Sequence, residues 1–211
     1  VDPAELLALA SVGEPPGSVG RVYAALRIDG PARELVEGVD ANGRVEVRRP
    51  LWLEVGAGPA VSLTGSPTTG LAEELANEVV GMSVRDAVAA LVRVIPERMT
   101  FASEPVFDPN AAMHGARGDC TEHAEVLVRT LHRLGQQASV RVGWRYREAR
   151  WVPHAWVRVT LPSAGEVDVD PTWGDRVAPS LMLALAPALQ VHPWEALGRG
   201  VGSRVWVEEA R

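Results

Sequence analysis

Lysine is absent from the 211-residue chain, cysteine occurs once, and phenylalanine and tyrosine occur twice each. A single cysteine excludes a disulfide bond within the chain, so the thiol is free or reactive. The net charge is -6, and no basic cluster is evident that would offset phosphate repulsion, which argues against a nucleic-acid partner. No apolar run approaches the roughly 20 residues of a membrane-spanning helix, so we expect no transmembrane segment.

Hydrophobic residues make up 46% of the chain and charged residues 23%, which is the balance of an ordinary globular protein with a sizeable core. Every basic residue is arginine, and alanine, glycine, valine and proline are abundant, a bias typical of a GC-rich bacterial genome. The sequence begins Val1-Asp2-Pro3 without a start methionine or a signal peptide, so a cytoplasmic and an exported location both stay open. No pattern requires a cofactor or indicates an oligomeric state.

Residues 1–65 are predicted to form a small β-rich region. Its first 20 residues hold an apolar helix candidate and then a Gly/Pro-rich stretch, which is typical of a tether. Strand-like segments then predict a small antiparallel sheet, at 22–28, 45–47 and 51–55. The stretch 56–70, rich in Gly, Pro, Ser and Thr, is the best candidate for a linker to the second region, residues 66–211.

The second region combines helices with strands. Helical spacing of apolar residues predicts three helices, at 71–80, 83–94 and 120–134. Ser83 is the expected N-cap of the second helix, and Gly135 ends the third. The stretch 96–117 has no clear period, and long loops of this kind often line functional sites. Three antiparallel strands follow, at 138–143, 155–161 and 166–170, so the expected class is α+β.

The lone cysteine, Cys120, lies where the third helix begins. Asp119, followed three residues later by Glu122 just before an apolar run, predicts a capping box that puts Cys120 in the first helical position. The helix dipole there favours the thiolate, but the two neighbouring carboxylates oppose it. The helix end alone is therefore not enough to activate the thiol, and a cationic partner is needed.

Two histidines compete for the role of that partner. His154 is predicted to open a strand, where its ring can be held rigidly. His123 lies three residues from Cys120 on the same helix and could also reach the sulfur, although a packed or hydrogen-bonded helix residue is the better interpretation of it. We therefore favour His154.

A histidine base needs an acceptor that orients its ring. The alternating segment 166–170 sets three carboxylates on one face of a strand and two valines on the other. Asp170 ends this strand at Pro171, where its side chain can reach the end of a neighbouring strand. Glu166 and Asp168 are better interpreted as part of a solvated strand face.

Three segments resemble signature blocks of the transglutaminase-like superfamily, whose core is related to papain-type cysteine proteases. Residues 118–124 (Gly-Asp-Cys-Thr-Glu-His-Ala) resemble the nucleophile block, 154–157 (His-Ala-Trp-Val) the histidine block, and 168–174 (Asp-Val-Asp-Pro-Thr-Trp-Gly) the aspartate block. The resemblance covers roughly residues 71–175. It implies an α+β, papain-like core in which an N-terminal catalytic-cysteine helix packs on an antiparallel β-sheet, preceded by the small β-rich region.

The resemblance also implies acyl transfer on a protein or peptide substrate, without a cofactor. The Cys120 thiolate would attack a carboxamide or peptide carbonyl, His154 would protonate the leaving amine, and Asp170 would orient His154. The resulting thioester would be resolved by water, as in a peptidase or amidase, or by an amine, as in a transglutaminase. Because the chain has no lysine, it cannot crosslink itself through lysine amines.

The oxyanion donors and the walls of the site are less defined by sequence. The backbone N–H of Cys120 is one expected donor, and His114, six residues upstream, is a positional candidate for another. Trp156 and Trp173 flank the expected base and acceptor, so they could shield the site from water, although core packing explains either residue equally well.

Two other interpretations compete with a catalytic triad. Cys120, His123, His154 and Asp170 could all be zinc ligands, but a lone Cys-x-x-His without a second paired half is a poor pattern for structural zinc. Alternatively, the chain could be a noncatalytic module that keeps this fold for protein binding.

Overall fold

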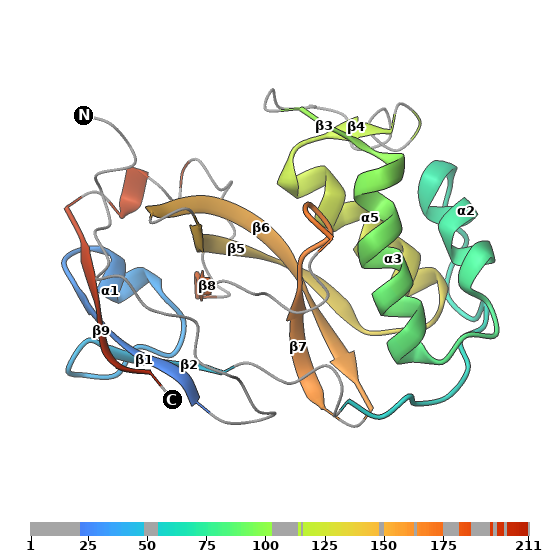
Figure 1. Ribbon diagram of the computed structural model, residues 1–211. Helices are drawn as coiled ribbons and strands as arrows, with labels where there is room; N and C mark the ends of the chain where they lie inside the picture. Colours follow the sequence, from blue (N-terminus) through green and yellow to red (C-terminus); the bar gives the residue numbers. More distant parts are fainter. Residues whose placement is uncertain are drawn as a thin grey trace. The chain divides into compact units, whose positions relative to one another are not determined.

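The computed structural model describes residues 22–48, 55–102, 114, 116–147, 150–162, 164–174, 182–186, 195, 198–200 and 202–210 (Figure 1). The expected tether, residues 51–54 and most of the stretch 96–117 lie outside them. No helix in the described ranges is long and apolar enough to cross a membrane.

Contacts divide the chain into two compact units, each drawn from several segments. The first comprises Val1–Leu51, Arg141–His154 and Pro179–Arg211, and the second comprises Trp52–Val140 and Ala155–Ala178. The division of the chain into an N-terminal region, residues 1–65, and a catalytic region, residues 66–211, stays a prediction.

The first unit contains a three-stranded antiparallel sheet. Its central strand, β1 (Val22–Asp29), pairs with β2 (Arg44–Arg48) on one side and with β9 (Arg204–Ala210) on the other. A short helix, α1 (Ala32–Leu35), follows β1. The sequence indicated the first two strands but not the third, because β9 pairs with a strand at the opposite end of the chain and carries no local signal of that partner.

A second sheet has the strand order β7-β6-β5-β8. Its members are β5 (Ala138–Arg147), β6 (Arg150–Leu161), β7 (Gly165–Val169) and β8 (Met182–Ala184). β5 and β6 each contribute residues to both units. β6 and β7 are antiparallel, as expected, and they turn alternate residues inward because successive side chains on a strand point to opposite faces.

β5 and β6 are both longer than expected. β5 runs past residue 143 to Arg147, and β6 begins before residue 155. β6 begins at Arg150, so His154 lies inside the strand instead of opening it. The extra residues include Trp151, which is buried in the core of the first unit. Burial of this large ring extends the strand although the alternation that predicted it starts only at Ala155.

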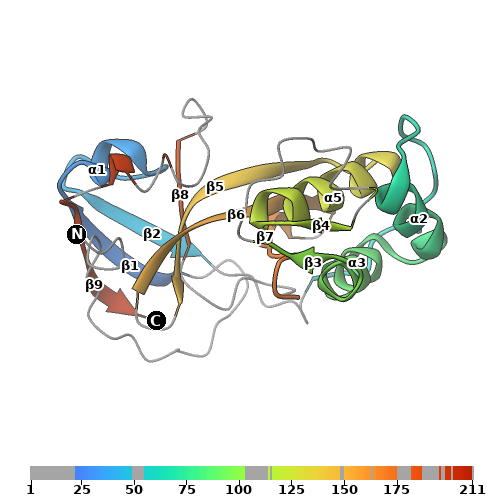
Figure 2. The same cartoon turned by 90° about the horizontal axis from the view of Figure 1, so that it is seen from above.

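Three helices form the other layer of the second unit. They are α2 (Gly70–Val79), α3 (Val84–Arg98) and α5 (Cys120–Arg133), which Figures 1 and 2 show grouped beside the short parallel pair β3 (Thr100–Phe101) and β4 (Arg117–Gly118). α5 packs against both α2 and α3. One apolar cluster joins these helices to the inward residues of β6 and β7, including Leu91, Leu127, Leu131, Val157, Val159 and Val169.

α3 begins where the sequence predicted but ends later. Ser83 is its N-cap, and the Ser83 hydroxyl accepts a hydrogen bond from the Asp86 N–H at 3.2 Å. The helix was expected to end at residue 94, before Pro96, yet it runs to Arg98. A proline in the last turn forfeits one hydrogen bond, whereas Ile95, with 0% exposure, keeps that turn against the core.

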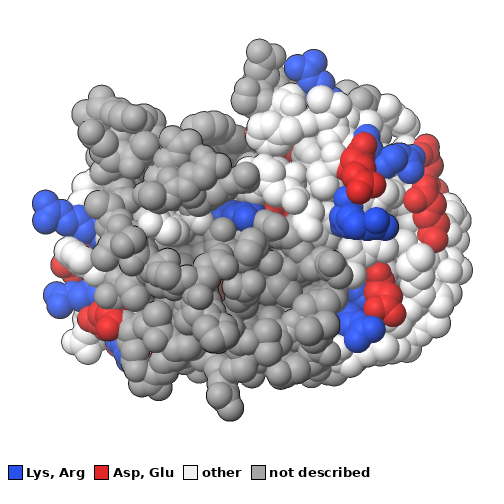
Figure 3. All heavy atoms as spheres, in the orientation of Figure 1, with Lys and Arg blue, Asp and Glu red and all other residues white. Residues whose placement is uncertain are grey.

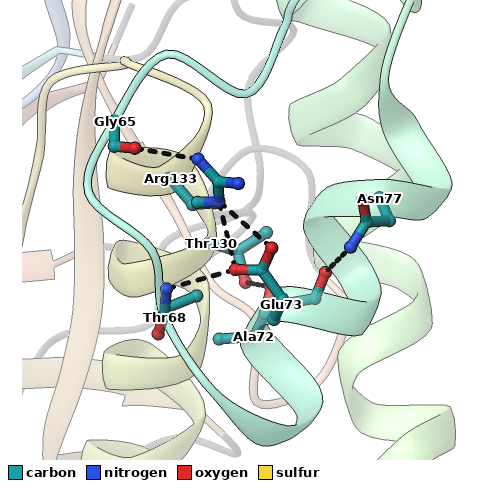
Figure 4. Close-up of polar contacts among 7 residues, drawn as sticks. All are labelled: Gly65, Thr68, Ala72, Glu73, Asn77, Thr130 and Arg133. Atoms are coloured by element: carbon teal, nitrogen blue, oxygen red, sulfur yellow. Dashed lines mark hydrogen bonds and ion pairs between the residues drawn. The ribbon is translucent and has the colours of Figure 1, made fainter.

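The predicted linker is tied to the helices by a polar cluster (Figure 4). The Gly65 N–H donates to the Arg133 carbonyl at 3.0 Å, and the Arg133 guanidinium donates to the Gly65 carbonyl at 2.8 Å. The same guanidinium lies 3.1 Å from the Glu73 carboxylate, which also accepts from the Thr68 N–H. These bonds, the one from Thr68 above all, hold the pKa of Glu73 below its usual range.

Several charged side chains on the helical layer form ion pairs. Arg98 bridges Glu74 and Glu78 on α2, at 2.7 and 2.9 Å. Figure 3 shows positive and negative side chains interspersed over the part of this face that the helices occupy. Such exposed pairs contribute little to stability, so the layer depends mainly on its apolar face.

Gly65→Ala tests how closely the linker is held. A Cβ at Gly65 would overlap the His132 carbonyl oxygen, and backbone cannot give way as a flexible side chain can. We expect a loss of about 1–3 kcal/mol in the free energy of unfolding, measured with urea. Gly198→Ala, where an added Cβ meets open space, is the matched control. Equal stability of Gly65→Ala and wild type would show that the linker is not closely packed.

Candidate active site

The first turn of α5 carries the predicted capping box. The Asp119 carboxylate accepts from the Thr121 N–H at 2.6 Å, and the Glu122 carboxylate accepts from the Asp119 N–H at 2.7 Å. Both carboxylates are buried. Glu122 can fold back because Gly118 has no side chain: a Cβ there would lie 2.7 Å from Glu122 Cγ. Cys120 therefore occupies the first helical position, as predicted.

The thiol of Cys120 is protonated in this environment at neutral pH. Burial above all, together with the negative charges of Asp119 and Asp170, raises the pKa of Cys120 to about 12. The backbone N–H groups of Ala155 and of Cys120 itself act in the opposite direction. The local helix end thus fails to activate the thiol, as its acidic neighbours indicated.

The influence of the Ala155 N–H on the thiol indicates that β6 passes near the start of α5. His154 is the residue immediately before Ala155 on this strand, and its side chain is 1% exposed.

Asp170 follows β7 and is fully buried. Its carboxylate accepts from the Thr172 N–H at 2.9 Å, which closes a tight turn after the strand. Gly174 ends that turn with φ 76° and packs near Pro96 on α3. The neighbouring carboxylate Asp168 pairs with Arg158 across the strands at 2.9 Å, in keeping with its interpretation as part of a solvated strand face.

His123 is packed and hydrogen-bonded, in line with the favoured interpretation of it. Its ring is fully buried, its Nδ1 lies 2.7 Å from the Asp119 carbonyl oxygen, and its ring centroid is 6.1 Å from that of Phe101. Burial lowers the pKa of His123, while the Asp119 and Met99 carbonyls and the charge of Asp170 oppose that shift.

The remaining expected site residues differ in exposure. Trp156 is fully buried, Trp173 is 38% exposed, and His114 is exposed. In the described part of the chain, no three His, Cys, Asp or Glu side chains are grouped so that they could hold a metal ion. The zinc interpretation therefore has no geometric support there.

A family model described as the transglutaminase-like superfamily matches residues 71–171. These residues belong to the transglutaminase-like superfamily. The match includes Cys120, His154 and Asp170, and the mixed arrangement of helices and antiparallel strands is that of a transglutaminase-like fold. None of the curated proteins matches the chain.

Among solved structures, a candidate cysteine protease from Cytophaga hutchinsonii is similar to 55% of this chain, at 15% identity and a TM-score of 0.46. A TGase is similar to 48% of it, at 22% identity and a TM-score of 0.42. The similar parts span only 40% and 30% of those two proteins. The periplasmic domain of TgpA from Pseudomonas aeruginosa, bound to ethylmercury, is similar over 84% of this chain and 95% of its own, at 17% identity and a TM-score of 0.42.

Sequence reasoning missed contacts of this transglutaminase-like site that no local pattern encodes. The effect of the Ala155 N–H on the thiol links a strand to a helix, and the ring contact of Phe101 with His123 crosses from β3 to α5. The glycine at 118 was a readable signal, because a glycine directly before a capping box allows the box to close over it.

Glu122→Gln tests the charge buried in the capping box. Burial raises the pKa of Glu122 from 4.5 to about 7, helped by the charge of Asp119 and opposed by the hydrogen bond from the Asp119 N–H. Between those pH values the folded state binds more protons than the unfolded state, so the wild type loses stability as pH rises. Glutamine keeps the accepting oxygen and cannot ionise. We expect the stability of the variant relative to wild type to increase by about 1–3 kcal/mol over that window.

The measurement is urea unfolding of both proteins at about pH 5 and about pH 8. Glu125→Gln, a partly exposed carboxylate on the same helix, is the control for the loss of one surface charge. If the stabilities of Glu122→Gln and Glu125→Gln relative to wild type change with pH to the same extent, the buried Glu122 carboxyl is not the cause of the pH dependence.

Proposed function

We propose that this chain catalyses thiol-dependent acyl transfer on a peptide or carboxamide substrate. Cys120 is the nucleophile, His154 the general acid and base, and Asp170 the residue that orients His154. The observation that supports this most is the position of Cys120 at the capped start of a helix inside the family-matched span, where the backbone N–H of Ala155, the residue directly after His154, lowers the pKa of the thiol.

The electrostatics of the thiol give the histidine its role. A thiol whose pKa lies near 12 is a poor nucleophile at neutral pH, because the thiolate is the attacking species. In the proposed mechanism His154 takes the thiol proton, and the imidazolium beside the sulfur offsets the charges of Asp119 and Asp170. Asp170, buried at the end of β7, stabilises that imidazolium.

The chemical steps follow from this proton transfer. The thiolate attacks the substrate carbonyl carbon, a C–S bond forms, and the carbonyl oxygen becomes an oxyanion. The imidazolium of His154 then gives its proton to the leaving nitrogen as the C–N bond breaks, which leaves a thioester and releases an amine. Water or a second amine attacks the thioester, His154 accepts its proton, and the thiol is restored.

The oxyanion needs donors that are already in place. The backbone N–H of Cys120 is at the first helical position, where a helix has no acceptor of its own for it. His114 is a second candidate donor by its position in the chain, and Trp156 and Trp173 are candidate walls that shield the thioester from bulk water. Product analysis identifies the acyl acceptor, because hydrolysis gives a free acid, whereas transfer to an added primary amine gives a new amide.

Alkylation with iodoacetamide tests the pairing of Cys120 with a histidine. Since Cys120 is the sole cysteine, every alkylated molecule reports this thiol. We expect wild type at about pH 6 to react faster than an ordinary exposed thiol, and His154→Ala to react at least about tenfold more slowly. His132→Ala, an exposed histidine at the far end of α5, is the matched control. Sluggish alkylation of wild type at that pH would sink the catalytic proposal.

A further inference from the structure

His123 holds the peptide group that precedes Cys120. Its Nδ1 lies 2.7 Å from the Asp119 carbonyl oxygen, and its backbone N–H donates to the same oxygen at 3.2 Å. A carbonyl oxygen can only accept, so Nδ1 carries the hydrogen of this bond. The Asp119 carbonyl and the Cys120 N–H belong to one peptide unit, which is planar and trans. Fixing the carbonyl therefore fixes the direction of the Cys120 N–H on the opposite edge.

The other ring nitrogen of His123 has no matching partner. Nε2 is buried and makes no hydrogen bond within the described part of the chain, although the Met99 carbonyl acts on the pKa of the ring. An unmet buried acceptor costs free energy, and a phenylalanine would keep the ring contact with Phe101 without that cost. The histidine is thus unfavourable for packing alone, and buried groups that break such a rule are often found at functional sites.

We infer that His123 is a positioning residue for the oxyanion: by donating to the Asp119 carbonyl, it aims the Cys120 N–H at the place where the substrate oxygen becomes negative. This rests on the proposed function. The bond also polarises the peptide group, because a hydrogen bond accepted by a carbonyl strengthens the donor on the same amide. The charged groups that bear on the ring, Asp119 and Asp170, are those that bear on the thiol.

Two reactions of Cys120 separate this role from a general effect on the thiol. Acylation by p-nitrophenyl acetate passes through an oxyanion, whereas alkylation by iodoacetamide displaces iodide and forms none. In His123→Phe we expect the acylation rate to fall about tenfold to hundredfold, with a smaller change in the alkylation rate. Thermal unfolding should show equal or higher stability, because the unmet Nε2 is removed.

Conservative variants locate the effect on the ring. Asparagine places its amide nitrogen where Nδ1 stood, so His123→Asn should recover much of the acylation rate. Glutamine places its nitrogen nearer to Nε2, so His123→Gln should stay slow, which keeps the test valid if the phenylalanine variant fails to fold. His132→Phe removes a histidine hydrogen bond to a carbonyl, that of Ala138, at the other end of α5 and serves as the control.

The outcomes are distinct. If His123→Phe and His123→Gln are acylated at the wild-type rate, or if acylation and alkylation fall together, His123 does not position the donor. The same conclusion follows if His123→Asn is as slow as His123→Gln. If instead wild type is not acylated at all, the proposed function fails, independently of His123.

Discussion

The buried N-terminus of α5 is the constraint around which the second unit is arranged. A helix start that is removed from water must find acceptors for its unpaired N–H groups among its own side chains. Asp119 and Glu122 meet that need, and the close approach of Glu122 to Gly118 gives the chain before the helix a fixed path. The apolar face of α5 can then pack on α2 and α3 with the cysteine held at the first turn.

Capping the helix with a carboxylate disfavours ionisation of the Cys120 thiol. The Asp119 carboxylate is a good cap because it is negative near a positive helix end, and for the same reason it disfavours a negative charge on Cys120. The cap thus stabilises the helix but leaves the resting thiol unreactive. Reactivity then has to come from a residue on another element, which is why the Ala155 contact between β6 and the sulfur matters more than anything within α5.

How far the sequence could predict the fold depended on the range of each interaction. The capping box, the buried stripe of α5 and the alternation in β7 repeat within a few residues, and they were predicted correctly. The pairing of β9 with β1 was not, because it joins opposite ends of the chain. Pro96 suggested an early end to α3, but burial of Ile95 outweighed the lost hydrogen bond. The contact of Phe101 with His123 depended on the pairing of β3 with β4, which has no local pattern.

The peptide group between Asp119 and Cys120 connects stability to catalysis. On the carbonyl side it accepts two bonds from His123, one from the backbone and one from the ring. On the amide side it presents the donor that a transition-state oxyanion would use. A helix N-terminus needs only the first of the two bonds, since the backbone bond already continues the helix. The ring bond comes in addition to that need, and it leaves Nε2 buried without a hydrogen bond to any residue that the structure describes. We therefore expect the ring bond to act through the Cys120 N–H. It holds in place a donor that must not reorient as negative charge develops on the substrate oxygen.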